Sequence, residues 1–92
     1  MAWLVGMTSK AKKQAASLPQ RVKDALALLM GDMEAGGPVR GDWPNYGKLS
    51  DTRHHCHIRK GTPCYVAVWE VTDKAIRIIE VQYVGTHEKA PY

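Results

Sequence analysis

Three consecutive segments near the C-terminus constrain the fold most strongly. Residues 53–59, 64–71 and 75–84 are rich in β-branched and aromatic side chains, and short turns at 60–63 and 72–74 separate them. The middle segment is apolar on both faces, so we expect it to lie at the centre of a sheet with cover on both sides. Together, the three segments predict an antiparallel meander.

The N-terminal residues predict a further strand and a short helix. Residues 1–7 are apolar, with no positive segment before them and no cleavage pattern after them, so we interpret them as a strand and not as a signal peptide. Thr8 or Ser9 can cap a helix over residues 9–16. Its apolar positions recur at helical spacing: Ala11, Ala15 and Leu18.

A second helix is expected after a break in the chain. Ser17, followed three residues later by Gln20, fits a capping box, and Pro19 is tolerated in a first turn. The helix should run to about residue 34, where Gly36, Gly37 and Pro38 end it. One apolar stripe, which we expect to pack against the sheet, consists of Val22, Leu26, Leu29 and Met33.

The segment 39–49 is interrupted by glycine and proline every few residues, so it can be neither a regular helix nor a central strand. We expect Trp43 and Tyr46 to pin it to the body of the domain. The alternative is that these rings offer a stacking surface to a nucleic acid base.

The chain is therefore expected to be one α+β domain over residues 1–92, with the element order β-α-α-β-β-β. Two N-terminal helices should pack on one face of a mainly antiparallel four-stranded sheet, and the other face should be partly open. The composition is that of a globular protein, with 45% hydrophobic and 24% charged residues. No apolar run approaches the roughly 20 residues that span a bilayer, and we expect a cytoplasmic protein with no membrane partner.

The segment 53–59 carries an unusual row of titratable side chains. Because strand side chains alternate between faces, one face should carry Arg53, His55, His57 and Arg59, and the other His54, Cys56 and Ile58. Imidazoles exchange protons near neutral pH, and guanidinium groups bind phosphate through a planar fork. This combination suits a protein that handles RNA. His54 is most simply a buried or edge histidine, and His55 is either a site residue or an exposed neighbour.

The two cysteines allow a disulfide only if the hairpin register places Cys56 opposite Cys64, and a cytosolic chain would keep them reduced. We favour packing as small apolar side chains. A zinc site is not expected, because there is no short paired spacing and alternation sends Cys56 and His57 to opposite faces. A thiol nucleophile is equally unsupported, and the pattern calls for no metal and no cofactor.

The net charge of +4 is unevenly distributed along the chain. The first 23 residues contain five basic side chains and no acidic one. These five are Lys10, Lys12, Lys13, Arg21 and Lys23. The net charge points to an acidic partner, either a nucleic acid or an acidic protein, whereas the expected interpretation of the N-terminal cluster itself is a solvated helix face.

Taken together, the order of elements and four short motifs resemble the RelE/ParE superfamily of toxin–antitoxin toxins, and within it the YafQ-like branch. These motifs are the turn-rich Gly41-Asp42-Trp43, the strand His55-Cys56-His57-Ile58, the ending Val84-Gly85-Thr86-His87 and the terminal aromatic Tyr92. The resemblance implies a bacterial toxin that enters the ribosomal A site, cuts mRNA and thereby represses translation. In that family the RNA 2′-hydroxyl attacks the adjacent phosphate without a metal, leaving a 2′,3′-cyclic phosphate and a 5′-hydroxyl.

The resemblance also implies roles for particular residues. His57 would act as base or acid, His87 as its partner or a phosphate ligand, and Tyr92 as a stacking platform or proton donor. The implied RNA and phosphate ligands are Lys48, Arg53, His55, Arg59 and Lys60. The chain departs from the YafQ-like pattern, because Arg59, Lys60 and Gly61 follow His57 where an acid is expected. The division of acid and base roles between the two histidines therefore stays open.

The expected partners are mRNA, the ribosome and a cognate antitoxin, which would pack over residues 10–23 or the open sheet face. If the complex binds its promoter DNA, the antitoxin should make most of the contacts. The alternative is a non-catalytic binding protein on the same scaffold, either a ParE-like gyrase poison or an inactive relic that binds an antitoxin. The histidine-rich strand and the His87 and Tyr92 ending favour the nuclease, because ParE-type members need no proton-transfer residues there.

Overall fold

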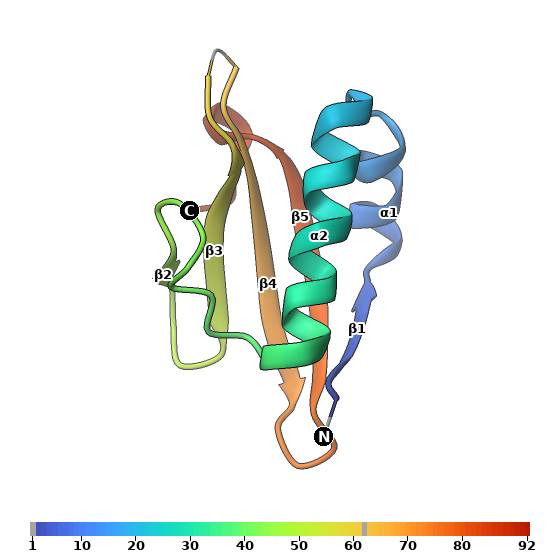
Figure 1. Ribbon diagram of the computed structural model, residues 1–92, viewed down its shortest axis with the longest axis vertical. Coiled ribbons are helices and arrows are strands. Elements are labelled where there is room, and N and C mark those ends of the chain that lie inside the picture. Colours follow the sequence, from blue (N-terminus) through green and yellow to red (C-terminus); the bar gives the residue numbers. More distant parts are fainter. Residues whose placement is uncertain (1, 62) are drawn as a thin grey trace.

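The computed structural model describes residues 2–61 and 63–92, which form two helices and a five-stranded sheet (Figure 1). In chain order the elements are β1 Leu4–Met7, α1 Ser9–Ala16, α2 Gln20–Gly36, β2 Gly47–Lys48, β3 Arg53–Arg59, β4 Tyr65–Asp73, β5 Ile78–Thr86 and the 3-10 turn η1 His87–Lys89. The α+β class and the order of the long elements are confirmed. Two positions of the predicted elements, Met1 in the first strand and Thr62 in the first turn, lie outside the described residues.

The sheet has the strand order β1-β5-β4-β3-β2. β3, β4 and β5 form the predicted antiparallel meander, and β1 pairs with β5 in parallel. The four-stranded prediction missed β2, a two-residue edge strand that pairs with β3. Such a short strand inside a segment rich in glycine and proline has no periodicity to reveal it. β4 lies at the centre, as predicted, and four consecutive residues, from Val66 to Trp69, are fully buried.

The first helix begins as the sequence predicts, because the Thr8 hydroxyl accepts a hydrogen bond from the Ala11 N–H at 3.0 Å. The predicted capping box of the second helix is wrong. Ser17 is the C-cap of α1, Pro19 is the N-cap of α2, and the Gln20 amide donates to Asp24 at 2.8 Å. A residue before proline avoids the helical region, so the helix cannot run back from Pro19 to Ser17.

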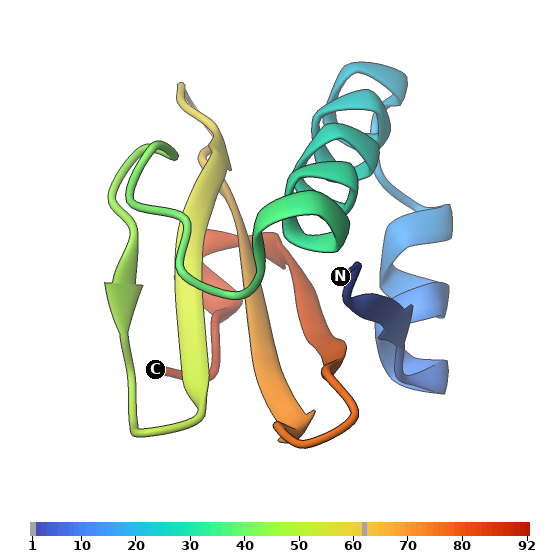
Figure 2. The same cartoon turned by 60° about the horizontal axis from the view of Figure 1, so that its bottom comes forward.

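Both helices cover the same face of the sheet (Figures 1 and 2). The predicted stripe of α2 is buried there: Val22, Leu26, Leu29 and Met33. It packs against side chains from β3, β4 and β5, including Cys56, Trp69 and Val81. Gly37 ends the helix at a φ of 90°, where a Cβ would lie only 3.0 Å from the Trp3 ring nitrogen. Across the described chain, neither helix is long and apolar enough to span a membrane.

The opposite face of the sheet has a smaller apolar cluster of Val66, Val68 and Tyr83, against which Leu49 and Ala90 pack. Ala90 belongs to the C-terminal tail, so this face is partly covered by the end of the chain itself. Figure 2 shows the tail on the far side of the sheet from the helices, ending near β3. This return of the tail brings the last residues next to the histidine-rich strand.

Trp43 and Tyr46 pin the segment between α2 and β3 to the domain. The Trp43 ring nitrogen donates to the Asp32 carboxylate at 2.8 Å, and the Tyr46 hydroxyl lies 2.6 Å from Nδ1 of His54. The Tyr46 ring also packs against Trp69, with ring centroids 6.2 Å apart. Both aromatic side chains are therefore engaged by the body of the domain, as the pinning interpretation predicts.

The turn between β4 and β5 differs from its predicted position. β4 continues to Asp73, and β5 begins at Ile78 and not at residue 75. The Asp73 carboxylate accepts a hydrogen bond from the Ile76 N–H at 3.0 Å, and Arg77 has a φ of 58°. A side chain that caps the backbone in this way favours a turn over a ladder, and propensity alone does not predict it.

Candidate functional site

Alternation along β3 separates its histidines as the sequence predicts. His54 is 3% exposed and packs on the helix side against both Tyr46 and Trp69, with ring centroids 5.8 and 6.0 Å away. His55 and His57 are half-buried on the opposite face. His54 is thus a core histidine, and the other two are available to a site on the open face of the sheet.

The C-terminal tail completes a cluster of four side chains, which we call the histidine cluster: His55, His57, His87 and Tyr92. The ring centroids of His57 and His87 are 5.3 Å apart, and those of His87 and Tyr92 are 6.0 Å apart. The Tyr92 ring lies 4.5 Å from the ring of His55. The structure therefore brings the three candidate catalytic side chains together, with His55 beside them.

Cys64 holds the two central histidines, a role that the sequence analysis missed. Its Sγ lies 3.2 Å from Nδ1 of His57, and its carbonyl oxygen accepts the backbone N–H of His87 at 2.9 Å. The position of Cys64 depends on the path of the chain before β4, and a local sequence pattern does not predict that path. Cys56 instead packs in the helix-side core, where burial raises the pKa of its thiol to about 12. Both cysteines are free, and they lie on opposite faces of the sheet.

Electrostatics favours the neutral forms of His55 and His57. Burial lowers the pKa of the His57 ring, and the charges of His87 and Lys60 lower it further. Burial also lowers the pKa of His55, with additional contributions from His57 and His87. A neutral imidazole can accept a proton at neutral pH. Burial raises the pKa of Tyr92, so its hydroxyl stays protonated and can donate.

His55 has an unsatisfied polar atom. Its Nδ1 is buried and has no hydrogen-bond partner within the described part of the chain. A buried polar atom without a partner costs about 1–3 kcal/mol, so each such atom calls for an explanation. Gly47 on β2 approaches the other side of the ring, because a Cβ there would lie 3.0 Å from Nε2 of His55.

The predicted phosphate ligands do not all lie in one place. Lys60 lies close enough for its charge to lower the pKa of His57, and Arg53 precedes His55 on the same face. Lys48 pairs in register with His54, so it lies toward the helix side of the sheet. Arg59 also leaves the predicted face. A register shift after His57 pairs Arg59 with Tyr65, beside the start of α2.

The histidines should make stability depend on pH. The pKa values of His54, His55 and His57 are lowered from the ordinary value of 6.5, with burial as the main cause. As the pH falls through this value, the unfolded chain therefore binds more protons than the folded chain does. The free energy of unfolding should decrease as a result. The slope is about 1.4 kcal/mol per pH unit for each histidine that takes up a proton on unfolding.

Urea unfolding between about pH 8 and pH 5 measures this effect. The variant His55→Gln, which removes one titrating ring, should show a shallower decrease than the wild-type protein. Stability that rises as the pH falls through this range would contradict the burial of these rings.

The sequence matches no protein-family model and no curated protein. Solved structures do match. A mutant of the Escherichia coli toxin RelE in the free state superposes with a TM-score of 0.75, covering 98% of this chain and 88% of that chain at 17% identity. The chain has the RelE fold. The archaeal RelE–RelB complex from Pyrococcus horikoshii gives a TM-score of 0.74, with 98% and 100% coverage and 13% identity.

A third structure with the RelE fold is the toxin–antitoxin complex RelBE2 from Mycobacterium tuberculosis. Its TM-score is 0.66, at 20% identity, with 95% of this chain and 93% of that chain covered. Identities of this size establish the RelE fold alone, and a fold hosts more than one function. The function of this chain has to be argued from its own side chains.

Proposed function

We propose that this protein is the toxin of a type II toxin–antitoxin system, and that it cleaves mRNA on the ribosome. The observation that carries the proposal is the histidine cluster, in which the rings of His57 and His87 have centroids 5.3 Å apart and Tyr92 packs against His87. Two proton-transfer groups at this spacing can act on either side of one phosphate. The shared fold with RelE toxins supports the same conclusion.

The proposed reaction is attack of the RNA 2′-hydroxyl on the adjacent phosphorus. The O2′–P bond forms, the P–O5′ bond breaks, and the products are a 2′,3′-cyclic phosphate and a 5′-hydroxyl. His57, with its lowered pKa, takes the 2′-hydroxyl proton as general base. The exposed His87 gives a proton to the leaving 5′-oxygen, and the two histidines exchange protonation states during the step.

The remaining members of the site stabilise charge and position the substrate. Negative charge develops on the phosphate oxygens, and Lys60 is the cation whose influence reaches His57. Tyr92 keeps its proton and can donate a hydrogen bond to the same oxygens or stack on a base. The His55 ring packs against the Tyr92 ring at a centroid distance of 4.5 Å. No step in this scheme requires a metal or a cofactor.

The proposal assigns the protein to the cytoplasm, where mRNA is translated, and gives it a cognate antitoxin as a partner. Two of the structural neighbours are complexes with an antitoxin. We expect the antitoxin to inhibit this chain by binding it, and to supply the contacts if the complex sits on promoter DNA.

Primer extension on a reporter mRNA in a translating bacterial extract tests the proposed function. The wild-type protein should produce cuts at fixed positions within codons, and the same mRNA without ribosomes should stay intact. Absence of cuts from folded protein would overturn the nuclease proposal. Inhibition of gyrase by that protein would then identify a ParE-like poison.

Cys64 offers a finer test of the site. Replacing it by alanine removes the group at Nδ1 of His57, so the imidazole is free to turn away from the substrate. A misplaced catalytic group costs up to about a hundredfold in rate, so Cys64→Ala should lower cleavage by roughly ten- to a hundredfold. Cys64→Ser keeps a polar group there and should restore most of the rate. Equal rates for the wild type and Cys64→Ala would show that the thiol does not orient His57.

A further inference from the structure

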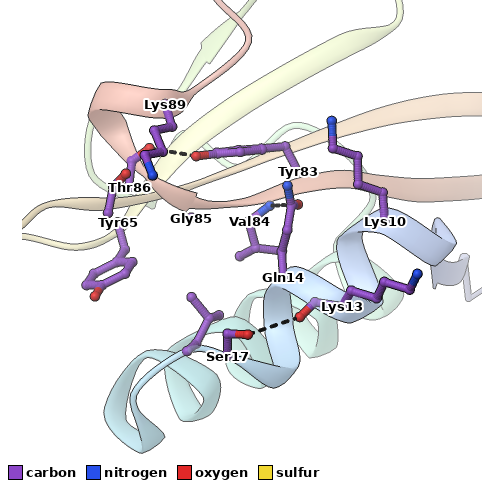
Figure 3. A pocket seen from close by; sticks show the side chains of 11 residues that line it. Lys10, Lys13, Gln14, Ser17, Tyr65, Tyr83, Val84, Gly85, Thr86 and Lys89 are labelled. Atoms are coloured by element: carbon purple, nitrogen blue, oxygen red, sulfur yellow. Dashed lines mark hydrogen bonds between the residues drawn. The ribbon is translucent and has the colours of Figure 1, made fainter.

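A basic groove lies between α1 and the C-terminal half of β5 (Figure 3). Its volume is about 530 Å³. Lys10 and Lys13 enter it from α1 and Lys89 from η1, on either side of the strand residues Tyr83 to Thr86. We call this feature the lysine groove.

The charge of the lysine groove selects its ligand. Its described lining residues include three lysines and no acidic side chain. Ammonium groups gathered around one cavity repel each other, and a bound anion relieves that repulsion. All three lysines are exposed, so they can reach a ligand without a large desolvation cost. A ligand with several negative charges spaced along a chain fits this arrangement.

The lysine groove shares one wall residue with a cavity of the proposed site. Thr86 lines both this groove and a smaller cavity of about 220 Å³, whose walls include Cys64, His87 and the acidic Glu88. Tyr65 connects the groove on its other side to a surface that carries Arg21, Arg59 and Lys60. A strand bound in the groove can therefore pass Thr86 and reach His87, beside the Glu88 carboxylate.

The strand edge in the groove is partly closed to an added peptide strand. β1 pairs with β5 only as far as Val81, so the rest of this β5 edge faces α1. There the Gln14 side-chain oxygen accepts the Val84 N–H at 3.1 Å (Figure 3). Sheet extension by a peptide needs such edge donors. Because Gln14 occupies this one, the observations favour a phosphate backbone over an acidic peptide as the occupant.

We propose that the lysine groove binds the phosphodiester backbone of single-stranded RNA and guides the strand into the histidine cluster. The inference rests on the proposed function and adds a second binding site to it. Tyr65, half-buried at the end of the groove, offers a ring on which one base of the strand stacks. This surface accounts for part of the positive N-terminal region, since Lys10 and Lys13 line the groove and Lys12 does not.

Binding of an uncleavable RNA tests the inference directly. The probe is a fluorescent single-stranded RNA of about ten nucleotides, with 2′-O-methyl groups throughout. The groove variant carries Lys10→Gln, Lys13→Gln and Lys89→Gln. The matched control carries three substitutions that remove the same charge elsewhere: Lys12→Gln, Lys23→Gln and Lys74→Gln. Circular dichroism and urea unfolding check that both variants fold.

The groove variant should bind RNA at least about tenfold more weakly than the control. The slope of its log binding constant against log salt concentration should be smaller by about two, because each of the three lost phosphate contacts contributes about 0.7. Equal losses of RNA affinity in the groove variant and the control, or no RNA binding by the wild-type protein at low salt, would overturn the inference. An oligoglutamate peptide is the second probe. Equal weakening toward this peptide and the RNA would indicate a general anion site, which also contradicts an RNA path.

The probe cannot be cleaved, so the result is independent of catalysis. Loss of RNA binding in a protein that never cuts mRNA would support the groove and contradict the nuclease. Cutting by the wild type together with unchanged binding by the groove variant would support the nuclease and contradict the groove.

Discussion

Alanine in place of His57 or His87 is expected to remove most of the cleavage activity. A general acid or base contributes about 10²–10⁴-fold to a rate, and each substitution deletes one of the two proton-transfer groups. The double variant should be little slower than either single variant, because groups that act together in one step are not additive. Quantitative primer extension with all three variants measures these losses.

Two controls separate a chemical effect from a structural one. Each variant is first compared with the wild type by urea unfolding, which should show only modest changes because His57 is half-buried and His87 exposed. Lys12→Ala, at an exposed site on α1 outside the cluster, should cut mRNA at the wild-type rate. If folded His57→Ala and His87→Ala proteins retain wild-type rates, the cluster is not the catalytic site.

Trp69→Ala should be among the most destabilising single changes in the chain. Trp69 is fully buried at the centre of β4, and its ring nitrogen donates to the Pro38 carbonyl at 3.0 Å. The ring also stacks on His54, at a centroid distance of 6.0 Å. Replacing a buried tryptophan by alanine costs about 3–5 kcal/mol through lost burial and the cavity left behind. That loss is a large fraction of the stability of a small domain.

Urea unfolding with Trp69→Phe and Trp3→Ala as matched controls measures the effect. Phenylalanine keeps most of the apolar area but cannot donate to Pro38, so we expect an intermediate loss. Trp3 is half-buried at the edge of the core, so its truncation should cost less than that of Trp69. A Trp69→Ala protein with wild-type stability would contradict the central position of β4 in the core.

Local pattern predicted the parts of the molecule that depend on local geometry. Side-chain direction reverses at every strand residue, so alternation correctly separated His55 and His57 from His54 and Cys56. The bounds of β3 also match their prediction. The apolar stripe of α2 was also predicted from local pattern, because its apolar residues recur with the period of 3.6 residues that places them on one helix face.

The remainder depends on contacts between distant segments. The displacement of Arg59 follows from a register shift that only the pairing with β4 defines. The Cys64–His57 contact requires the path of the loop between them, and β2 exists only because β3 provides a partner. The family resemblance, and not the spacing of residues, predicted that His87 and Tyr92 belong with His57. The structure places them together, and their catalytic roles remain a proposal.

The most direct test of the central claim is the identity of the RNA ends that cleavage leaves. A short mRNA is bound to purified bacterial ribosomes, treated with the protein and analysed by mass spectrometry, beside a copy with a 2′-deoxy nucleotide at the cut position. We predict a 2′,3′-cyclic phosphate and a 5′-hydroxyl, and no cut in the deoxy copy, because the 2′-hydroxyl is the nucleophile. Ends with a 3′-hydroxyl and a 5′-phosphate, or cleavage of the deoxy copy, would contradict the account.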